Sequence, residues 1–487
     1  MLLRALIATL VFAVALGQTA LYAQSVELEL EHIMWTLVFS LPIGLSVLLG
    51  SLGTRRLEYP SLGLCALALW NFAIAPAFIV ELPEMRYGIV YSLEAGVLGR
   101  WLFLVWCLVF AMAAGRAREE PVKLRVSGHE IVAIAVPIAI ALVYQLMQGM
   151  FTAYQVTDKE RVTDTRIVIA ACIGKNALVF LPGFFLLVAS RVRQHPGLVW
   201  FCRGAGAITV ILLLLTGGRS GIAFSAALGF YYARSAGYRV SIVRSAVVLA
   251  AVPIAFLLVF AYRNAVQGSE EQVVLFSDLT SMASNSASDM IATGDSRDRA
   301  LGDFSDNVRI RAAVGLQFFA VVENWLSHGA AFEWTFADGL IRVLPSYLFP
   351  GKNELAMNYG FEGALKRTGR VPDVDLAPTF WMQWLFEFGL AGLIIGAVFF
   401  GRLVRLVERR IGTTSSVFEV LFWGYVLSTI CTVEVTTDIL FLSMRDGLVV
   451  VSLAYGISRL IVLFTRSRGA NGQAEAEPSE RPAPHFG

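Results

Sequence analysis

Apolar runs long enough to cross a lipid bilayer recur along this chain. A transmembrane helix needs about 20 mostly apolar residues, and about twelve runs fit that template. The sequence is 56% hydrophobic and 16% charged, against roughly 45–50% and 25% in soluble domains. We therefore predict an all-α polytopic membrane protein. The expected spans are 4–23, 33–53, 62–82, 97–115, 131–151, 167–190, 200–217, 220–233, 245–262, 379–401, 415–436 and 440–464.

Arginine and lysine gather in alternate connections between these spans. Short cytoplasmic connections carry the excess of such residues. We therefore expect both termini in the cytoplasm and the long connection 263–378 outside. Against this pattern stand Lys159, Arg161 and Arg166. The basic connections hold Arg55 and Arg56; Arg116, Arg118, Lys123 and Arg125; Arg191 and Arg193; Arg234, Arg239 and Arg244; Arg402, Arg405, Arg409 and Arg410; Arg466 and Arg468.

The connection 263–378 is the one long polar interval of the chain. Its amphipathic stretch Val314–Trp325 predicts folded helices there rather than a linker. The end of the chain is poor in apolar residues, which predicts disorder. We expect an uncleaved first helix, because the residues before Gln24 make a poor cleavage site. The expected organisation is transmembrane helices 1–9 in 1–262, an external loop domain in 263–378, helices 10–12 in 379–464 and a disordered cytoplasmic tail in 465–487.

Arg219 stands among glycines at the expected external tip of a tight hairpin, after Gly217 and Gly218. Glycine lets the backbone turn sharply and approach a ligand, and the free N–H groups of a following helix favour an anion. A guanidinium there can hold a phosphate or carboxylate through two parallel hydrogen bonds. The alternative is that Arg219 reaches toward lipid headgroups without a functional role.

Further arginines lie in the external loop. Arg309 and Arg311 open the amphipathic stretch, where their charge opposes the helix dipole unless an anion is bound. Pairing with nearby aspartates is the alternative explanation. Arg263, which leaves the ninth span at the membrane surface, has the same two readings. These three residues are candidate anion ligands.

The loop also holds candidate acid and base groups. His328 could act as a general base near neutral pH, although a single histidine in a turn is more often structural. Asp373 and Asp375 precede the tenth span, and Glu387 lies about two turns into it. Carboxylates there could accept a proton from a sugar hydroxyl, and ordinary surface aspartates are the alternative.

Charged residues also fall inside expected spans, namely Lys175 in the sixth and Arg445 with Asp446 in the twelfth. A charge at that depth costs at least about 2.5–3.5 kcal/mol on insertion scales, so each should face a cavity or a partner. Asp446, Glu434 or Asp438 could neutralise Arg445. The five cysteines form no close pair with one another or with histidine, and no recognised nucleotide or metal motif is present.

Several segments together form a pattern of known type. They are the Gly-Gly-Arg-Ser-Gly hairpin tip, the long loop after the ninth span, the segment Arg311–Gly329 ending in Trp-Leu-Ser-His-Gly, and Leu376–Gly392. In this layout the chain resembles the Wzy-type O-antigen and exopolysaccharide repeat-unit polymerases over residues 200–460. The related O-antigen ligases share the layout, but they typically carry His-Asn where this chain has Pro378-Thr379, so the polymerases fit better.

The resemblance implies a GT-C-like, metal-independent glycosyltransferase that needs no cofactor. It would join undecaprenyl-diphosphate-linked oligosaccharides at the periplasmic face of the bacterial inner membrane, with a chain-length regulator and a flippase as partners. Arg219 with Arg309 or Arg311 would neutralise the diphosphate leaving group. Two other classes stay open, a lipid-linked sugar flippase or exporter and a nonenzymatic scaffold. No basic tract indicates nucleic acid.

Overall fold

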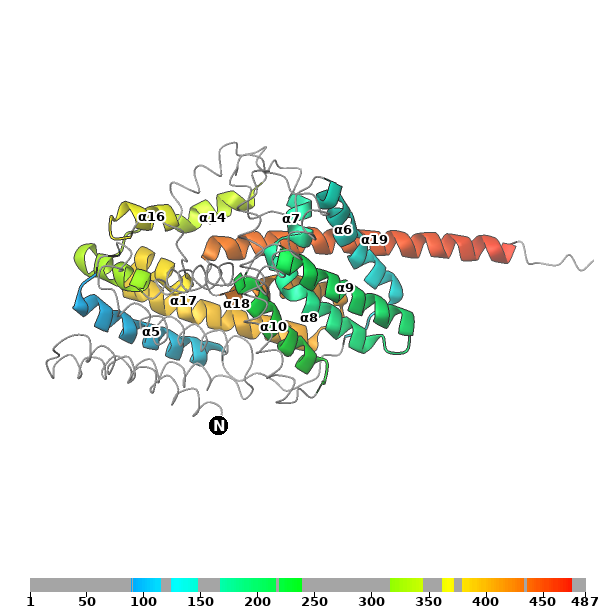
Figure 1. Ribbon diagram of the computed structural model, residues 1–487, viewed down its shortest axis with the longest axis horizontal. Helices are drawn as coiled ribbons and strands as arrows, with labels where there is room; N and C mark the ends of the chain where they lie inside the picture. Colours follow the sequence, from blue (N-terminus) through cyan, green and yellow to red (C-terminus); the bar gives the residue numbers. More distant parts are fainter. Residues whose placement is uncertain are drawn as a thin grey trace, which may run out of the picture.

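The computed structural model describes residues 89, 91–114, 124–147, 167–215, 219–238, 316–344, 361–371, 379–432 and 436–474, which form helices, turns and one isolated bridge, without strands (Figure 1). Four helices in these ranges are long and apolar enough to cross a membrane: Glu94–Ala114, Pro196–Leu214, Phe380–Thr413 and Thr437–Thr465. Gly128–Tyr144, Asn176–Arg191 and Val417–Ile430 are apolar but shorter. This is the all-α membrane architecture that the sequence predicts. The expected spans 4–23, 33–53, 62–82 and 245–262 lie outside the described residues.

Outside the long polar interval, the described helices fall on the expected apolar runs. In chain order they are α5 (Leu93–Ala114), α6 (Gly128–Met147), α7 (Ile167–Ile173), α8 (Lys175–Arg191), α9 (Pro196–Leu215), α10 (Arg219–Ser235), an unlabelled helix of residues 316–328, α14 (Thr335–Val343), α16 (Phe361–Arg367), α17 (Phe380–Thr413), α18 (Val417–Thr432) and α19 (Thr437–Ala474).

Local signals in the sequence explain where several helices begin. The Ser92 hydroxyl accepts from the Ala95 N–H at 3.1 Å and so caps α5. At the start of α6 the Glu130 carboxylate accepts from the Ser127 N–H at 2.9 Å and from the Ser127 hydroxyl at 2.8 Å, the glutamate half of a capping box. Pro196 opens α9, a position where its missing N–H has no cost.

One end of the bundle, which we call the loop end, carries the helices of the long polar interval. The Ser92 N–H at the start of α5 donates to Glu323 of helix 316–328 at 3.0 Å. α14 packs on α19 and contacts α16, and the ring of Phe361 in α16 lies 5.6 Å from that of Phe386 in α17. Folded helices therefore occupy this interval, as the amphipathic stretch predicts.

The opposite end, which we call the basic end, gathers the arginine-rich connections. The Arg125 N–H, after α5, donates to the Ser415 carbonyl, after α17, at 3.1 Å. At the start of α6, a Cβ on Gly128 would lie 3.5 Å from Leu198 in the first turn of α9. The described arginines of these connections thus lie away from helices 316–328, α14 and α16. Figure 1 shows α19 projecting far beyond the other helices, with α14 and α16 lying near its other end.

α17 reverses direction at Gly389, whose φ of 61° and ψ of −150° are outside the helical region. We call residues 380–388 its short limb and residues 390–413 its long limb. The stacked rings of Phe380 and Phe400 are 3.9 Å apart, whereas an uninterrupted helix would separate them by about 30 Å. Gly396 permits the contact, because a Cβ there would lie 2.8 Å from Trp384. The expected tenth span 379–401 is therefore a helical hairpin, and both of its limbs contact α5.

Two further differences concern neighbouring spans. The expected sixth span breaks at Gly174 into α7 and α8, and Gly174 is extended, with a ψ of 167°. Consequently Lys175 lies at the start of a helix rather than in mid-span. α19 continues to Ala474, into the stretch where the sequence predicts a disordered tail. The residues there include Arg466, Arg468, Ala470 and Gln473, which favour helix, beside Gly469 and Gly472, which do not.

Candidate functional site

The connection between helix 316–328 and α14 docks on the turn of α17. Where the short limb ends, carbonyl groups lose their helical partners. The Phe386 carbonyl accepts from the Ala331 N–H at 2.8 Å, and the Glu387 carbonyl accepts from the Phe332 N–H at 3.1 Å. A Cβ on Gly389 would lie 2.7 Å from Nε1 of Trp325, so the absence of a side chain lets helix 316–328 approach the turn.

A buried carboxylate then holds the start of α14. Glu387, which is 0% exposed, accepts from the Trp334 N–H at 2.9 Å and the Thr335 N–H at 2.7 Å. Neither Thr335 nor Trp334 caps the helix with its own side chain. Free N–H groups at a helix start favour an anion. Glu387 is thus a capping residue contributed by another helix rather than an acceptor of substrate protons.

Gln383, one turn earlier and also 0% exposed, connects three helices. Its side-chain amide donates to the Thr335 hydroxyl at 3.0 Å, and its carbonyl oxygen accepts from the Thr437 N–H at 2.9 Å. The starts of α14 and α19 are therefore joined through the short limb of α17. This buried network holds the helices that underlie the loop end in place.

A pocket of about 340 Å³ opens at the loop end, beside the docked connection. The pocket presents both hydrogen-bond donors and acceptors against one aromatic face. The Arg367 guanidinium forms an ion pair with the Glu333 carboxylate. The lining residues are Asn324, His328, Gly329, Ala330, Ala331, Glu333, Ala364, Arg367, Thr368 and Phe386. Such a mixture suits a ligand rich in hydroxyl groups.

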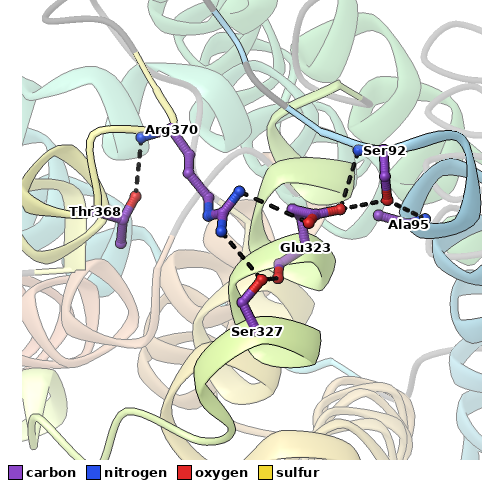
Figure 2. A network of polar contacts seen from close by, with 6 residues as sticks. All are labelled: Ser92, Ala95, Glu323, Ser327, Thr368 and Arg370. Carbon is purple, nitrogen blue, oxygen red and sulfur yellow. Dashed lines mark hydrogen bonds and ion pairs between the residues drawn. The ribbon is translucent and has the colours of Figure 1, made fainter.

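A polar network closes the adjoining side, as Figure 2 shows. Glu323 accepts from both the N–H and the hydroxyl of Ser92. Arg370 lies 3.8 Å from the other Glu323 oxygen and donates to the Ser327 hydroxyl at 3.0 Å. The Thr368 hydroxyl, which accepts from the Arg370 N–H at 3.3 Å, connects this network to the pocket wall. Together these contacts tie α5, helix 316–328 and the turn after α16 to one another.

The network perturbs the titration of Glu323. Hydrogen bonds from the Ser92 hydroxyl and then from its N–H lower the pKa of the Glu323 carboxyl, with a smaller effect of the Arg370 charge in the same direction. Partial burial acts against them. Glu323 is consequently held as a carboxylate over the physiological pH range, which keeps Arg370 oriented beside the pocket.

Among the expected site residues that the structure describes, His328 is the one that lines this pocket. It is the last residue of helix 316–328, and its side chain is exposed. Arg219 opens α10, in a turn where a Cβ on Gly221 would lie 3.0 Å from Leu213 of α9. α10 therefore begins beside the last part of α9, near Val179 of α8, as a tight hairpin requires, and the tip residues between the two helices lie outside the described part of the chain.

The intramembrane charges lie apart from the pocket. Arg445 donates to Asp446 at 2.9 and 2.7 Å, one of the partners expected for it. Lys175 opens α8, and the next residue, Asn176, donates to the Ser443 hydroxyl of α19 at 2.7 Å. These residues form a polar region where α7 meets α8, between the long bundle helices.

Other expected site residues lie outside the described part of the chain. Their proposed roles stay predictions. They are Gly217, Gly218, Arg263, Arg309, Arg311, Asp373 and Asp375.

Two cations at this site, Arg367 and Arg370, are not among the residues expected from the sequence. Arg367 ends α16 and Arg370 follows it in the turn, and their basic character near a turn is the only signal for them in the sequence. Their partners Glu333 and Glu323 come from positions far earlier in the chain. Among the described residues, no three His, Cys, Asp or Glu side chains group as metal ligands. Comparisons with protein-family models, curated proteins and solved structures gave no match.

Proposed function

We propose that the protein is a membrane-embedded glycosyltransferase that joins undecaprenyl-diphosphate-linked oligosaccharide units into a polysaccharide at the periplasmic face of the inner membrane. The observation that carries this proposal is the position of the polar pocket. Helices of the long polar interval line the pocket, which lies at the end of the bundle opposite the arginine-rich connections. A lipid-linked sugar whose lipid lies in the bilayer would present its hydroxyl groups at that end of the bundle.

The pocket residues suit the acceptor sugar. A sugar hydroxyl is both a donor and an acceptor, and the Asn324 amide, the Thr368 hydroxyl and the Glu333–Arg367 pair can satisfy both roles. His328, exposed at the rim, is the described residue best placed to accept the proton of the attacking hydroxyl.

The proposed step is a substitution at the anomeric carbon of the donor. The acceptor oxygen forms a bond to that carbon, its proton passes to the His328 imidazole, and the bond between the carbon and the diphosphate oxygen breaks. The electron pair leaves with undecaprenyl diphosphate. A cation lowers the barrier by neutralising the charge that develops on this leaving group. Arg219 is proposed for that role, together with Arg309 or Arg311.

Transport of a lipid-linked sugar is the second candidate, and one observation favours it. The break at Gly174 brings a helix start, Asn176 and Ser443 together between bundle helices. Interrupted helices of this kind form substrate sites in many transporters. Formation of glycosidic bonds by the purified protein separates the two functions, because a transporter forms none.

The test uses purified full-length protein in nanodiscs with a lipid-linked oligosaccharide, followed by gel analysis of chain length, with and without excess EDTA. We expect a ladder of polymers in both conditions. His328→Ala should slow synthesis by about 10²–10⁴-fold, the usual contribution of a general base. His195→Ala is the matched control, because His195 is an exposed histidine at the basic end. Equal rates for the two variants would remove His328 from the reaction, and the absence of any ladder from the unmodified protein would refute the proposed function.

A further inference from the structure

The start of the short limb of α17 lies deep in the bundle, about half-way along α5. Thr379 and Trp381 are 0% and 1% exposed. The ring of Trp381 lies 5.2 Å from that of Phe103 and 5.1 Å from that of Trp106, both in α5. A helix therefore begins inside the protein, where water is excluded from its first N–H groups.

Three buried polar groups at this place have no hydrogen-bond partner. They are the hydroxyl of Thr379 and the indole N–H groups of Trp381 and Trp106. Thr379 is the N-cap residue, yet its hydroxyl makes no capping hydrogen bond. A buried polar group without a partner costs about 1–3 kcal/mol, so the three together mark a place where a partner is missing.

The chemistry of these groups specifies that partner. An indole N–H can only donate, and the first N–H groups of a helix are also donors with a partial positive charge. All of these groups need an acceptor, and all except the hydroxyl favour a negative one. A helix start with such surroundings is suited to phosphate.

We propose that the start of the short limb of α17 binds a phosphate oxyanion, with Thr379, Trp381 and Trp106 as ligands to its oxygens. This site is separate from the pocket at the loop end, which takes sugar hydroxyl groups. The inference goes beyond the proposed function, because binding does not require glycosidic-bond formation. A protein that bound the oxyanion and built no polymer would refute the proposed function alone.

The test measures binding by full-length protein in dodecyl maltoside micelles, which contain no phosphate. Three probes distinguish the source of the oxyanion: undecaprenyl diphosphate, inorganic pyrophosphate and phosphatidylglycerol. Kd comes from titration of the tryptophan fluorescence, supported by the rise in unfolding temperature on binding. We expect undecaprenyl diphosphate to bind, and Thr379→Val and Trp381→Phe each to raise its Kd by about 10–100-fold, the effect of one hydrogen bond to a charged group.

Thr209→Val is the matched control. Thr209 is equally buried, but its hydroxyl donates to the Gly206 carbonyl of its own helix at 2.7 Å, so its loss should leave Kd within about two-fold. Without ligand, Thr379→Val should unfold at the same or a higher temperature, because it removes an unpaired group. If the two site variants weakened the binding of pyrophosphate or phosphatidylglycerol but not that of undecaprenyl diphosphate, the site would still be supported, with that other compound as the source of the oxyanion. An unchanged Kd for all three probes in both site variants would overturn the proposal, since water would then satisfy the donors.

Discussion

The carboxylate of Glu387 in α17 accepts a hydrogen bond of 2.7 Å from the backbone N–H of Thr335 in α14, and so holds the start of α14 on a bundle helix. Glu387→Ala would leave the buried Thr335 N–H unpaired and would also remove the acceptor of the less buried Trp334 N–H. A buried unpaired group costs about 1–3 kcal/mol, so we expect a loss of at least that size in the free energy of unfolding. Denaturant unfolding of the purified protein in detergent measures it.

Glu387→Gln refines that experiment, because glutamine keeps one of the two acceptor oxygens. We expect its stability to lie between those of the unmodified protein and Glu387→Ala. If the alanine variant were as stable as the unmodified protein but inactive, Glu387 would be a catalytic residue rather than a cap.

Gly389→Ala should destabilise the turn of α17. The φ and ψ of Gly389 belong to a region that other residues rarely adopt, at a cost of about 1–3 kcal/mol, and the new Cβ would also press on Trp325. The midpoint of unfolding measures the effect. Gly204→Ala in α9 is the control, because its Cβ would meet nothing within 4 Å, and we expect a gain of about 0.5–1 kcal/mol there. Equal stability of the two variants would mean that α17 does not reverse at Gly389.

The network around Glu323 should lose its contribution to stability in acid. Because hydrogen bonds from Ser92 lower the pKa of Glu323 in the folded protein, the contribution is fully present above the unfolded pKa, near 4.3. It is lost as the pH falls through the lower folded value. The difference in unfolding temperature between the unmodified protein and Glu323→Gln should therefore be present at pH 7 and shrink below about pH 4. A difference independent of pH would contradict this account, and Ser92→Ala should move the loss to higher pH.

The loop end should face the periplasm. The described arginine-rich connections lie at the opposite end of the bundle, where the cytoplasm is expected. An alkaline-phosphatase fusion near Gly339 in α14 should therefore be active, and one near Arg405 in the long limb of α17 inactive. The reverse pattern would place the pocket in the cytoplasm and exclude a periplasmic reaction.

Arg219→Lys should fail almost as badly as Arg219→Ala if the guanidinium clamps a diphosphate through two hydrogen bonds, since lysine keeps the charge but not the planar fork. We expect both variants to slow polymer synthesis by about 10²–10³-fold, as the loss of one donor to a developing charge does elsewhere. Chain length and turnover at matched membrane abundance provide the measurement. Normal synthesis by the lysine variant would indicate that Arg219 only anchors the helix at the lipid surface.

The sequence predicts the bundle helices well, because apolar runs and the breaks between them are local signals. α9 and α10, for example, begin and end within a few residues of the expected spans. The reversal of α17 at Gly389 has no such local signal. A single glycine between Phe388 and Leu390 is compatible with a continuous helix, and the contacts of Trp325 and Ala331 that accompany the turn come from distant positions. For the same reason the capping role of Glu387 is not visible in the sequence.

The buried side chain of Gln383 has a consequence for communication between the loop end and the bundle. Its hydrogen bonds to Thr335 and Thr437 link the start of α14 to the start of α19. A ligand that displaced α14 would either break a buried hydrogen bond or carry the start of α19 with it. A partner that bound the projecting end of α19 and shifted that helix would therefore change the affinity for a ligand at the loop end. By thermodynamic reciprocity, the ligand would change the affinity for the partner by the same factor.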